Sequence, residues 1–459
     1  MRLELLKIGI SDTILFHKPM KKLTVIVTLV FFGAVTSLIR LFVGNVMSVR
    51  QILWAEDGLF ALCIRNNGIL ECLSSPYSGS MKSTIPKLLA GLIAPFSVLH
   101  WAIVANIVAA ITIGVLVCLV FHLLRISGGS KALALALSVT PLVHPSLGVE
   151  SVNSTANLYI PLTYVVMLVL ILPSTKSQLR RPALAALVFA GILTMPPLFF
   201  VLLLGFALDK SRIANCKLWL TSGVAGVAAL SIELVGTLID SGQRPMNPSA
   251  TSLVDYITRI PLKLVESIIG DQPAEDIALL YEPEVFWVGI PATLAVVFLV
   301  LVSLRFSERI RTAMGLVASG MLLSIVPSLA YGVIDRYFIW LQLSVAAAAM
   351  WLLYASDGWR LTRILLSTAV FVAWLFGGSF PAAESRVSES YSWSFYLSEA
   401  SMQCRNQAVE SVEVLFAPDW PLAEDAKAQA SGVHRNHIRC SDLKGFRSSV
   451  DSSESSYDD

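Results

Sequence analysis

The sequence predicts an all-α protein that crosses a membrane many times, and three observations predict this class. Of its 459 residues, 55% are hydrophobic and only 14% are charged, and the mean hydropathy of +0.70 lies outside the range of soluble globular proteins. Apolar runs of about 18 to 25 residues recur along the chain, which is the length that a helix needs to cross a hydrocarbon core. Runs of alternating polarity are missing, so the predicted spans are helices.

The distribution of charge predicts how these helices are oriented. Lys and Arg gather in every second connecting segment and carboxylates in the others, so we place the basic segments in the cytoplasm. The basic N-terminal segment 1–22 runs into a long apolar stretch without a cleavage site, a pattern typical of an uncleaved anchor. The N-terminus is then cytoplasmic and the C-terminus exported. We predict eleven spans, at 23–43, 101–124, 130–143, 157–172, 183–194, 197–208, 218–238, 286–304, 312–331, 337–354 and 363–380.

This model divides the chain into a transmembrane domain, 23–380, and an exported C-terminal region, 381–447, followed by a disordered tail, 448–459. The first exported loop, 44–100, is long, and we interpret 86–99 as a helix lying in the membrane interface. Other local predictions are a break between two short helices at Met195, Pro196 and Pro197, and a strand at 413–416.

Four cysteines lie in exported segments, where an oxidising compartment permits disulfides. Cys63 and Cys72 share the first exported loop, and Cys404 and Cys440 share the C-terminal region. Each pair is either a disulfide or a pair of buried thiols. Neither pair has the spacing of a zinc site.

Polar residues gather near the exported ends of the predicted spans. Charged groups at membrane depth are costly, so those close to the interface usually face a cavity. We therefore expect these side chains to converge on one site. The set consists of Glu56, Asp57 and Tyr77 in the first exported loop, His144, Glu150, Asn153 and Asn157 in the second, and Arg336 and Tyr337 between two later spans.

The acidic residues suggest the chemistry. Asp57 is a candidate general base, since a carboxylate in a partly dry site takes a proton well; the alternative is a solvated acid or a helix cap ahead of Gly58. Glu56 binds a divalent cation, Mg²⁺ or Mn²⁺, or fixes the acceptor, and Glu150 is a candidate third acid and metal ligand.

The basic residues suggest binding roles. Arg336 suits phosphate recognition, because a guanidinium offers a planar fork; alternatively it pairs with Asp335 and caps the loop. His144, between Pro141 and Pro145, is either a hydrogen-bonded structural residue or a substrate contact. Arg40 either extends to the exported interface or reaches into the cavity.

Some functions are not indicated. The net charge of +2 gives no sign of a nucleic-acid partner. The sequence lacks a Walker-type loop, a Rossmann fingerprint, a His-Glu-x-x-His motif and a Gly-x-Ser-x-Gly elbow. A lipid-borne substrate fits this chain better than a nucleotide.

Several motifs together resemble the GT-C class of membrane glycosyltransferases, in particular uncharacterised bacterial members. The motifs are Trp-Ala-Glu-Asp-Gly at 54–58, Pro-Tyr-Ser-Gly at 76–79 and Ile-Pro-Lys-Leu-Leu-Ala at 85–90, with weaker matches at 153–162, at 194–196, at Arg336 and Tyr337, and at Trp393, Cys404, Trp420 and Cys440. Lys87 replaces the expected Arg and Ser80 an expected aromatic residue, which affects contacts with the donor phosphate.

The resemblance implies a GT-C-like bundle in a bacterial inner membrane. It also implies inverting transfer of a sugar from a polyprenyl-phosphate donor to a glycan or lipid acceptor on the exported face, with Asp57 as base and Glu56 beside it. One alternative is a polysaccharide polymerase or ligase of the O-antigen type, although those enzymes tend to use Arg and His in late loops. The other is a flippase or transporter, which predicts ionisable groups at mid-membrane, where Glu233 is the one candidate.

Overall fold

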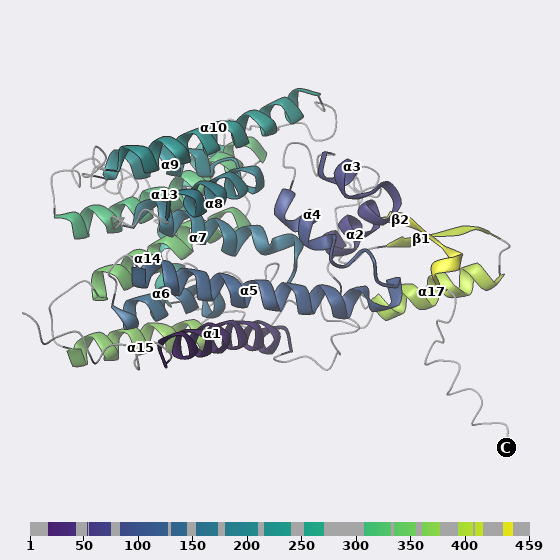
Figure 1. Ribbon diagram of the computed structural model, residues 1–459, viewed down its shortest axis with the longest axis horizontal. Helices are drawn as coiled ribbons and strands as arrows, with labels where there is room; N and C mark the ends of the chain where they lie inside the picture. Colours follow the sequence, from purple (N-terminus) through teal and green to yellow (C-terminus); the bar gives the residue numbers. More distant parts are fainter. Residues whose placement is uncertain are drawn as a thin grey trace, which may run out of the picture.

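The structure is a computed structural model in which an elongated helical bundle carries a smaller group of short helices and a hairpin at one end (Figure 1). The structure describes residues 17–42, 53, 55–74, 83–126, 130–144, 153–172, 180–209, 215–239, 252–269, 307–331, 335–354, 360–376, 393–406, 409–415 and 435–443.

The bundle is all-α, as the sequence predicts. Its helices are α1 (His17–Phe42), α5 (Trp101–Ile126), α6 (Lys131–Val143), α7 (Tyr159–Ile171), α8 (Arg180–Thr194), α9 (Leu198–Leu208), α10 (Cys216–Ile239), α11 (Ser252–Ile269), α13 (Glu308–Tyr331), α14 (Ile339–Tyr354) and α15 (Arg360–Phe376).

Within the described residues, three helices are long and apolar enough to cross a membrane, namely Leu23–Arg40, Val98–Arg125 and Glu308–Leu329. Most of the other predicted spans are shorter apolar helices, below the roughly 20 residues of a full crossing. The predicted span at 286–304 lies outside the described residues. The helical class therefore holds, whereas the count of eleven crossings stays a prediction.

Glycine lets α1 and α5 pack closely against each other. A Cβ on Gly33 would lie 2.8 Å from the Cα of Gly114, and a Cβ on Gly114 would overlap the backbone of Val30. Small residues at a helix crossing allow the two backbones to approach, which is the usual basis of helix association in membranes. This pair of helices places the end of α1 beside the start of the site described below.

The helix α7 lies at the centre of the main core, and nearly every one of its side chains is buried. A helix that is apolar on all sides is stable only when other elements surround it. Here α8, α9, α13 and α14 pack around it. The predicted break also holds, because α8 ends at Thr194 and α9 begins at Leu198, after the prolines at 196 and 197.

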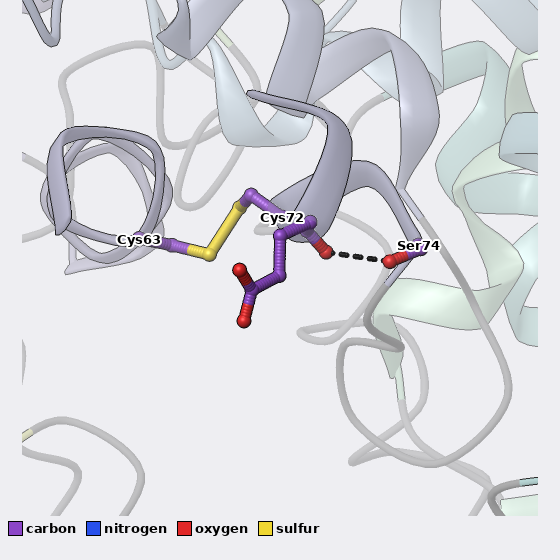
Figure 2. Close-up of a disulfide and its surroundings, with 4 residues drawn as sticks. Cys63, Cys72 and Ser74 are labelled. Atoms are coloured by element: carbon purple, nitrogen blue, oxygen red, sulfur yellow. Dashed lines mark hydrogen bonds between the residues drawn. A yellow bond between two sulfur atoms is a disulfide. The ribbon is translucent and has the colours of Figure 1, made fainter. Parts of the chain in front are cut away.

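The segment predicted to be the first exported loop contains short helices at one end of the bundle: α2 (Ala55–Asn67), α3 (Ile69–Ser74), α4 (Thr84–Ala90) and the 3-10 turn η1 (Val98–His100). A disulfide between Cys63 and Cys72 joins α2 to α3 (Figure 2). The prediction of one helix over 86–99 was wrong beyond Ala90, where turns follow. Pro95 lacks a backbone N–H and disfavours helix in the residue before it, so the helix cannot continue.

The C-terminal region packs on these short helices. It contains α17 (Trp393–Asn406), the antiparallel strands β1 (Ser411–Leu415) and β2 (Arg435–Arg439), and η6 (Cys440–Leu443), with a disulfide between Cys404 and Cys440. The Trp393 ring stacks on Trp101 at 6.4 Å between centroids, and its indole N–H donates to the Val98 carbonyl at 2.9 Å. The strand predicted at 413–416 corresponds to β1.

Candidate functional site

The first turn of α2 positions Asp57, whose side chain is only 2% exposed. Its Oδ1 accepts hydrogen bonds from the Ser154 hydroxyl at 3.2 Å, the Thr155 hydroxyl at 2.7 Å and the Ala156 backbone N–H at 2.7 Å. These donors begin the helical segment η3 (Ala156–Leu158) that leads into α7. The carboxylate therefore pairs with the Ala156 N–H, which the start of a helix leaves without an intrahelical partner, and the three hydrogen bonds fix its orientation.

Asn153 holds this segment against the bundle. Its φ of 52° is in the left-handed region, which Asn tolerates better than most residues. The Asn153 amide donates to the backbone and side-chain oxygens of Asn106 on α5, at 3.0 and 2.8 Å, and accepts from the Ser37 hydroxyl on α1 at 2.9 Å. The segment that holds Asp57 is thus tied to both long helices.

A buried lysine from α4 lies in the same cluster. The Lys87 side chain is 2% exposed, and its Nζ lies 5.8 Å from the ring centroid of Phe60, one turn after Asp57 on α2. Phe60, Ala90 and Ala156 pack together, so α2, α4 and η3 meet at this point. A carboxylate and an ammonium group are therefore both buried where these elements meet, which is costly unless the charges are compensated.

Arg40, near the end of α1, reaches inward. Its guanidinium donates from Nη1 to the Leu142 carbonyl at 2.8 Å and from Nη2 to the His144 carbonyl at 3.5 Å. With Ser37 and Asn153, it lines a small, mainly apolar cavity between α1, α5, α6 and α7. The Arg40 side chain is only 3% exposed, so it points into the protein. Arg40 also connects the Asp57 cluster to His144.

His144 is fully buried and hydrogen-bonded at the end of α6. Its Nε2 lies 3.2 Å from the Ser267 carbonyl, and its ring packs 4.9 Å from Trp374. Because a carbonyl oxygen only accepts, Nε2 carries the proton. Burial, together with the smaller effect of the nearby Arg40 charge, lowers the pKa of His144 to about 3 against the opposing hydrogen bond to Ser267, so the imidazole is neutral at physiological pH. This environment suits a structural residue better than a substrate contact.

A buried ion pair on α11 was missed from the sequence. Lys263 and Glu266 form a salt bridge at 2.8 Å, and the Gln342 amide donates to the same carboxylate at 2.6 Å. Glu266 has no exposed surface. The stretch 239–285 was interpreted as an exported loop. A helical spacing of Tyr256, Ile260, Lys263 and Ser267 in it was the available signal, since these positions form one buried face.

The other predicted site residues fall into two groups. Asn157 and Tyr337 are buried, in η3 and in η4 (Asp335–Phe338) respectively. Glu56 lies in α2 and Arg336 in η4, but their side chains are outside what the structure describes. So are the side chain of Glu233 and the whole of Tyr77 and Glu150.

The predicted metal ligands are among the residues whose side chains the structure does not describe. In the described part of the chain, His, Cys, Asp and Glu side chains do not gather in a group of three or more that could hold a metal ion. The predicted ligands Glu56 and Glu150 both lie beyond that description.

No protein-family model matches the chain, and no curated protein is significantly similar to it. Its own structure therefore defines the class. Within its described residues it is an all-α protein with helices long and apolar enough for a membrane, and it buries several charged groups, among them Asp57 and Lys87 where α2, α4 and η3 meet.

Proposed function

We propose that the protein is an integral-membrane glycosyltransferase that uses a polyprenyl-phosphate sugar on the exported face of a bacterial inner membrane. The acceptor would be a glycan or lipid of the cell envelope. The observation that carries the proposal is that Asp57 and Lys87 are both buried where α2, α4 and η3 meet, at the end of an apolar bundle. The distribution of basic residues predicts that this end is the exported one.

The proposed mechanism is a direct displacement. The acceptor hydroxyl oxygen attacks the anomeric carbon, the Asp57 carboxylate takes the hydroxyl proton, and the bond between that carbon and the phosphate oxygen breaks. The phosphate leaves with the electron pair, so no covalent intermediate forms. The three hydrogen bonds to Asp57 Oδ1 support this role, because they fix the orientation of the carboxylate before substrate binds.

Positive charge near the base suits the leaving phosphate. The Lys87 ammonium group, buried near Asp57, would compensate charge that develops on the phosphate, and Arg336 would bind it through a guanidinium. Glu56 and Glu150 are the residues that would hold a divalent cation, Mg²⁺ or Mn²⁺, which would add further positive charge.

The distribution of buried charge favours an enzyme over a transporter. In the described part of the chain, Arg40, Asp57, Lys87, Lys263 and Glu266 are buried towards one end of the bundle, and Arg311 is buried at the other end, so the buried charges lie towards the ends of the bundle. A transporter would place its ionisable groups at mid-membrane, around the site that alternates between the two faces.

Analysis of surface glycans and lipid-linked intermediates in a deletion strain distinguishes the candidate functions. A transferase predicts an envelope glycan that lacks one type of sugar while the polymer keeps its length. A change in polymer length alone would indicate a polymerase or ligase. Accumulation of a complete lipid-linked glycan would indicate a transporter. Either of these two results would contradict the proposal.

A further inference from the structure

A second polar cavity lies at the opposite end of the bundle from Asp57. The helix α7 starts beside the segment that holds Asp57, and its last residues line this cavity, together with the ends of α9 and the first turns of α10 and α13. With 13 residues in α7, the two places are about 20 Å apart at 1.5 Å per residue. The polar groups that line the cavity are Asp209, Trp219, Glu308, Arg311 and Thr312.

Arg311 is the group that indicates a ligand. Its side chain is only 5% exposed, and its buried Nη1 has no hydrogen-bond partner. A guanidinium keeps its charge inside a protein and is costly to bury without an anion. The planar fork of a guanidinium fits the oxygen atoms of a phosphate. The cavity therefore presents a cation that an anionic group would complete.

Carboxylates lie in the same cavity. Asp209 Oδ2 accepts hydrogen bonds from the Trp219 indole N–H at 2.8 Å and from the Asn215 amide at 3.2 Å, which fixes the carboxylate in the lining. Glu308 is exposed one turn before Arg311 on α13. An arginine and two carboxylates together suit a ligand that carries both a phosphate and a positive charge.

An apolar groove continues from this cavity. It runs between α9 and α10, and Trp219 lines both the groove and the cavity. Leu220 and Val224 are each 64% exposed along it, and a Cβ on Gly223 would meet nothing within 4 Å. Such a groove has the character of a binding site for a hydrocarbon chain. The other residues that line it are Phe199, Leu202, Leu203, Phe206, Cys216, Val227 and Ala228.

We propose that the cavity and groove bind one membrane phospholipid of the phosphatidylethanolamine type. Arg311 holds its phosphate, Asp209 and Glu308 hold its ammonium group, and an acyl chain lies along α9 and α10. The continuity of a charged cavity with an apolar groove identifies a lipid rather than free phosphate. The site is independent of the chemistry proposed at Asp57. Its occupant would fasten α9, α10 and α13 together.

Native mass spectrometry of the purified full-length protein tests this site, with phosphatidylethanolamine or phosphatidylglycerol added in detergent. We expect retention of phosphatidylethanolamine by the wild-type protein and a drop of about tenfold or more in Arg311→Gln, because a charge-assisted contact is lost. Arg309→Gln is the matched control on the same helix. The Arg309 guanidinium donates instead to the Leu352 carbonyl at 3.1 Å, so this variant should retain the lipid.

A second variant keeps the proposal testable if Arg311→Gln folds poorly. A Cβ at Gly223 would meet nothing within 4 Å and this glycine lines the groove, so Gly223→Phe should fold and yet lose the acyl chain. Undiminished phosphatidylethanolamine binding by both variants would overturn the site. Equal retention of phosphatidylglycerol by the wild type would overturn the part of the proposal that assigns the carboxylates to an ammonium group. Binding of inorganic phosphate without any lipid retention would show a phosphate site instead.

Discussion

The buried pair on α11 gives a prediction whose size follows from the structure. Glu266 has no exposed surface and accepts from both Lys263 and Gln342. Glu266→Gln preserves the shape of the side chain but removes its charge, which leaves Lys263, a residue only 9% exposed, without the carboxylate that compensates its charge. Breaking one partner of a buried ion pair costs about 3 to 5 kcal/mol.

Thermal unfolding in detergent measures this loss. If each kcal/mol lowers the melting temperature by about 2 °C, the lower end of the range for larger domains, Glu266→Gln should melt about 6 to 10 °C below the wild type. The double variant Lys263→Met with Glu266→Gln should recover much of that loss, because the uncompensated charge is gone. A single variant that melts within about 2 °C of the wild type would refute the reasoning.

Two further perturbations test the packing and the electrostatics. Gly114→Ala places a Cβ against the backbone of α1 and should lower the free energy of unfolding by about 1 to 3 kcal/mol. The control Gly223→Ala adds a Cβ that meets nothing within 4 Å, so this variant should melt at or above the wild-type temperature. Equal melting temperatures for the two variants would contradict the close packing of α1 on α5. Because the folded-state pKa of His144 is about 3, below its usual 6.5, stability should be constant above pH 6.5 and should fall as pH drops towards 3, by up to about 1.4 kcal/mol per pH unit. In His144→Asn this contribution to the melting profile should disappear, and an unchanged profile would show that other groups cause it.

The apolar helices could be predicted from the sequence, whereas the function that the motifs of residues 54–90 suggest stays a prediction. Hydropathy located α1, α5 and α13, because length and composition decide whether a helix can span a membrane. The break at Pro196 and Pro197 was also clear, since proline removes a backbone donor. The strand β1 contains two valines, which favour extended structure, and the predicted strand 413–416 overlaps it at 413–415.

The sequence could not show which distant residues meet. The hydrogen bonds that join Asp57 to Ser154 and Thr155 cross almost a hundred residues, and no local pattern indicates them. Average hydropathy predicted a loop at 239–285, because the polar residues Lys263 and Glu266 lower the mean hydropathy of this stretch. An average of this kind does not detect an amphipathic helix.

The role of Asp57 is the central claim, and Asp57→Asn tests it most directly. Asparagine keeps an oxygen that can accept from residues 154–156, so α2 stays anchored, but the amide cannot act as a base. In a deletion strain that carries this variant, we predict that the protein level and melting temperature are those of the wild type. Mass spectrometry of the envelope glycan should show that the transferred sugar is missing. Restoration of the wild-type glycan by Asp57→Asn would show that Asp57 only anchors the helix and would contradict its assignment as the general base.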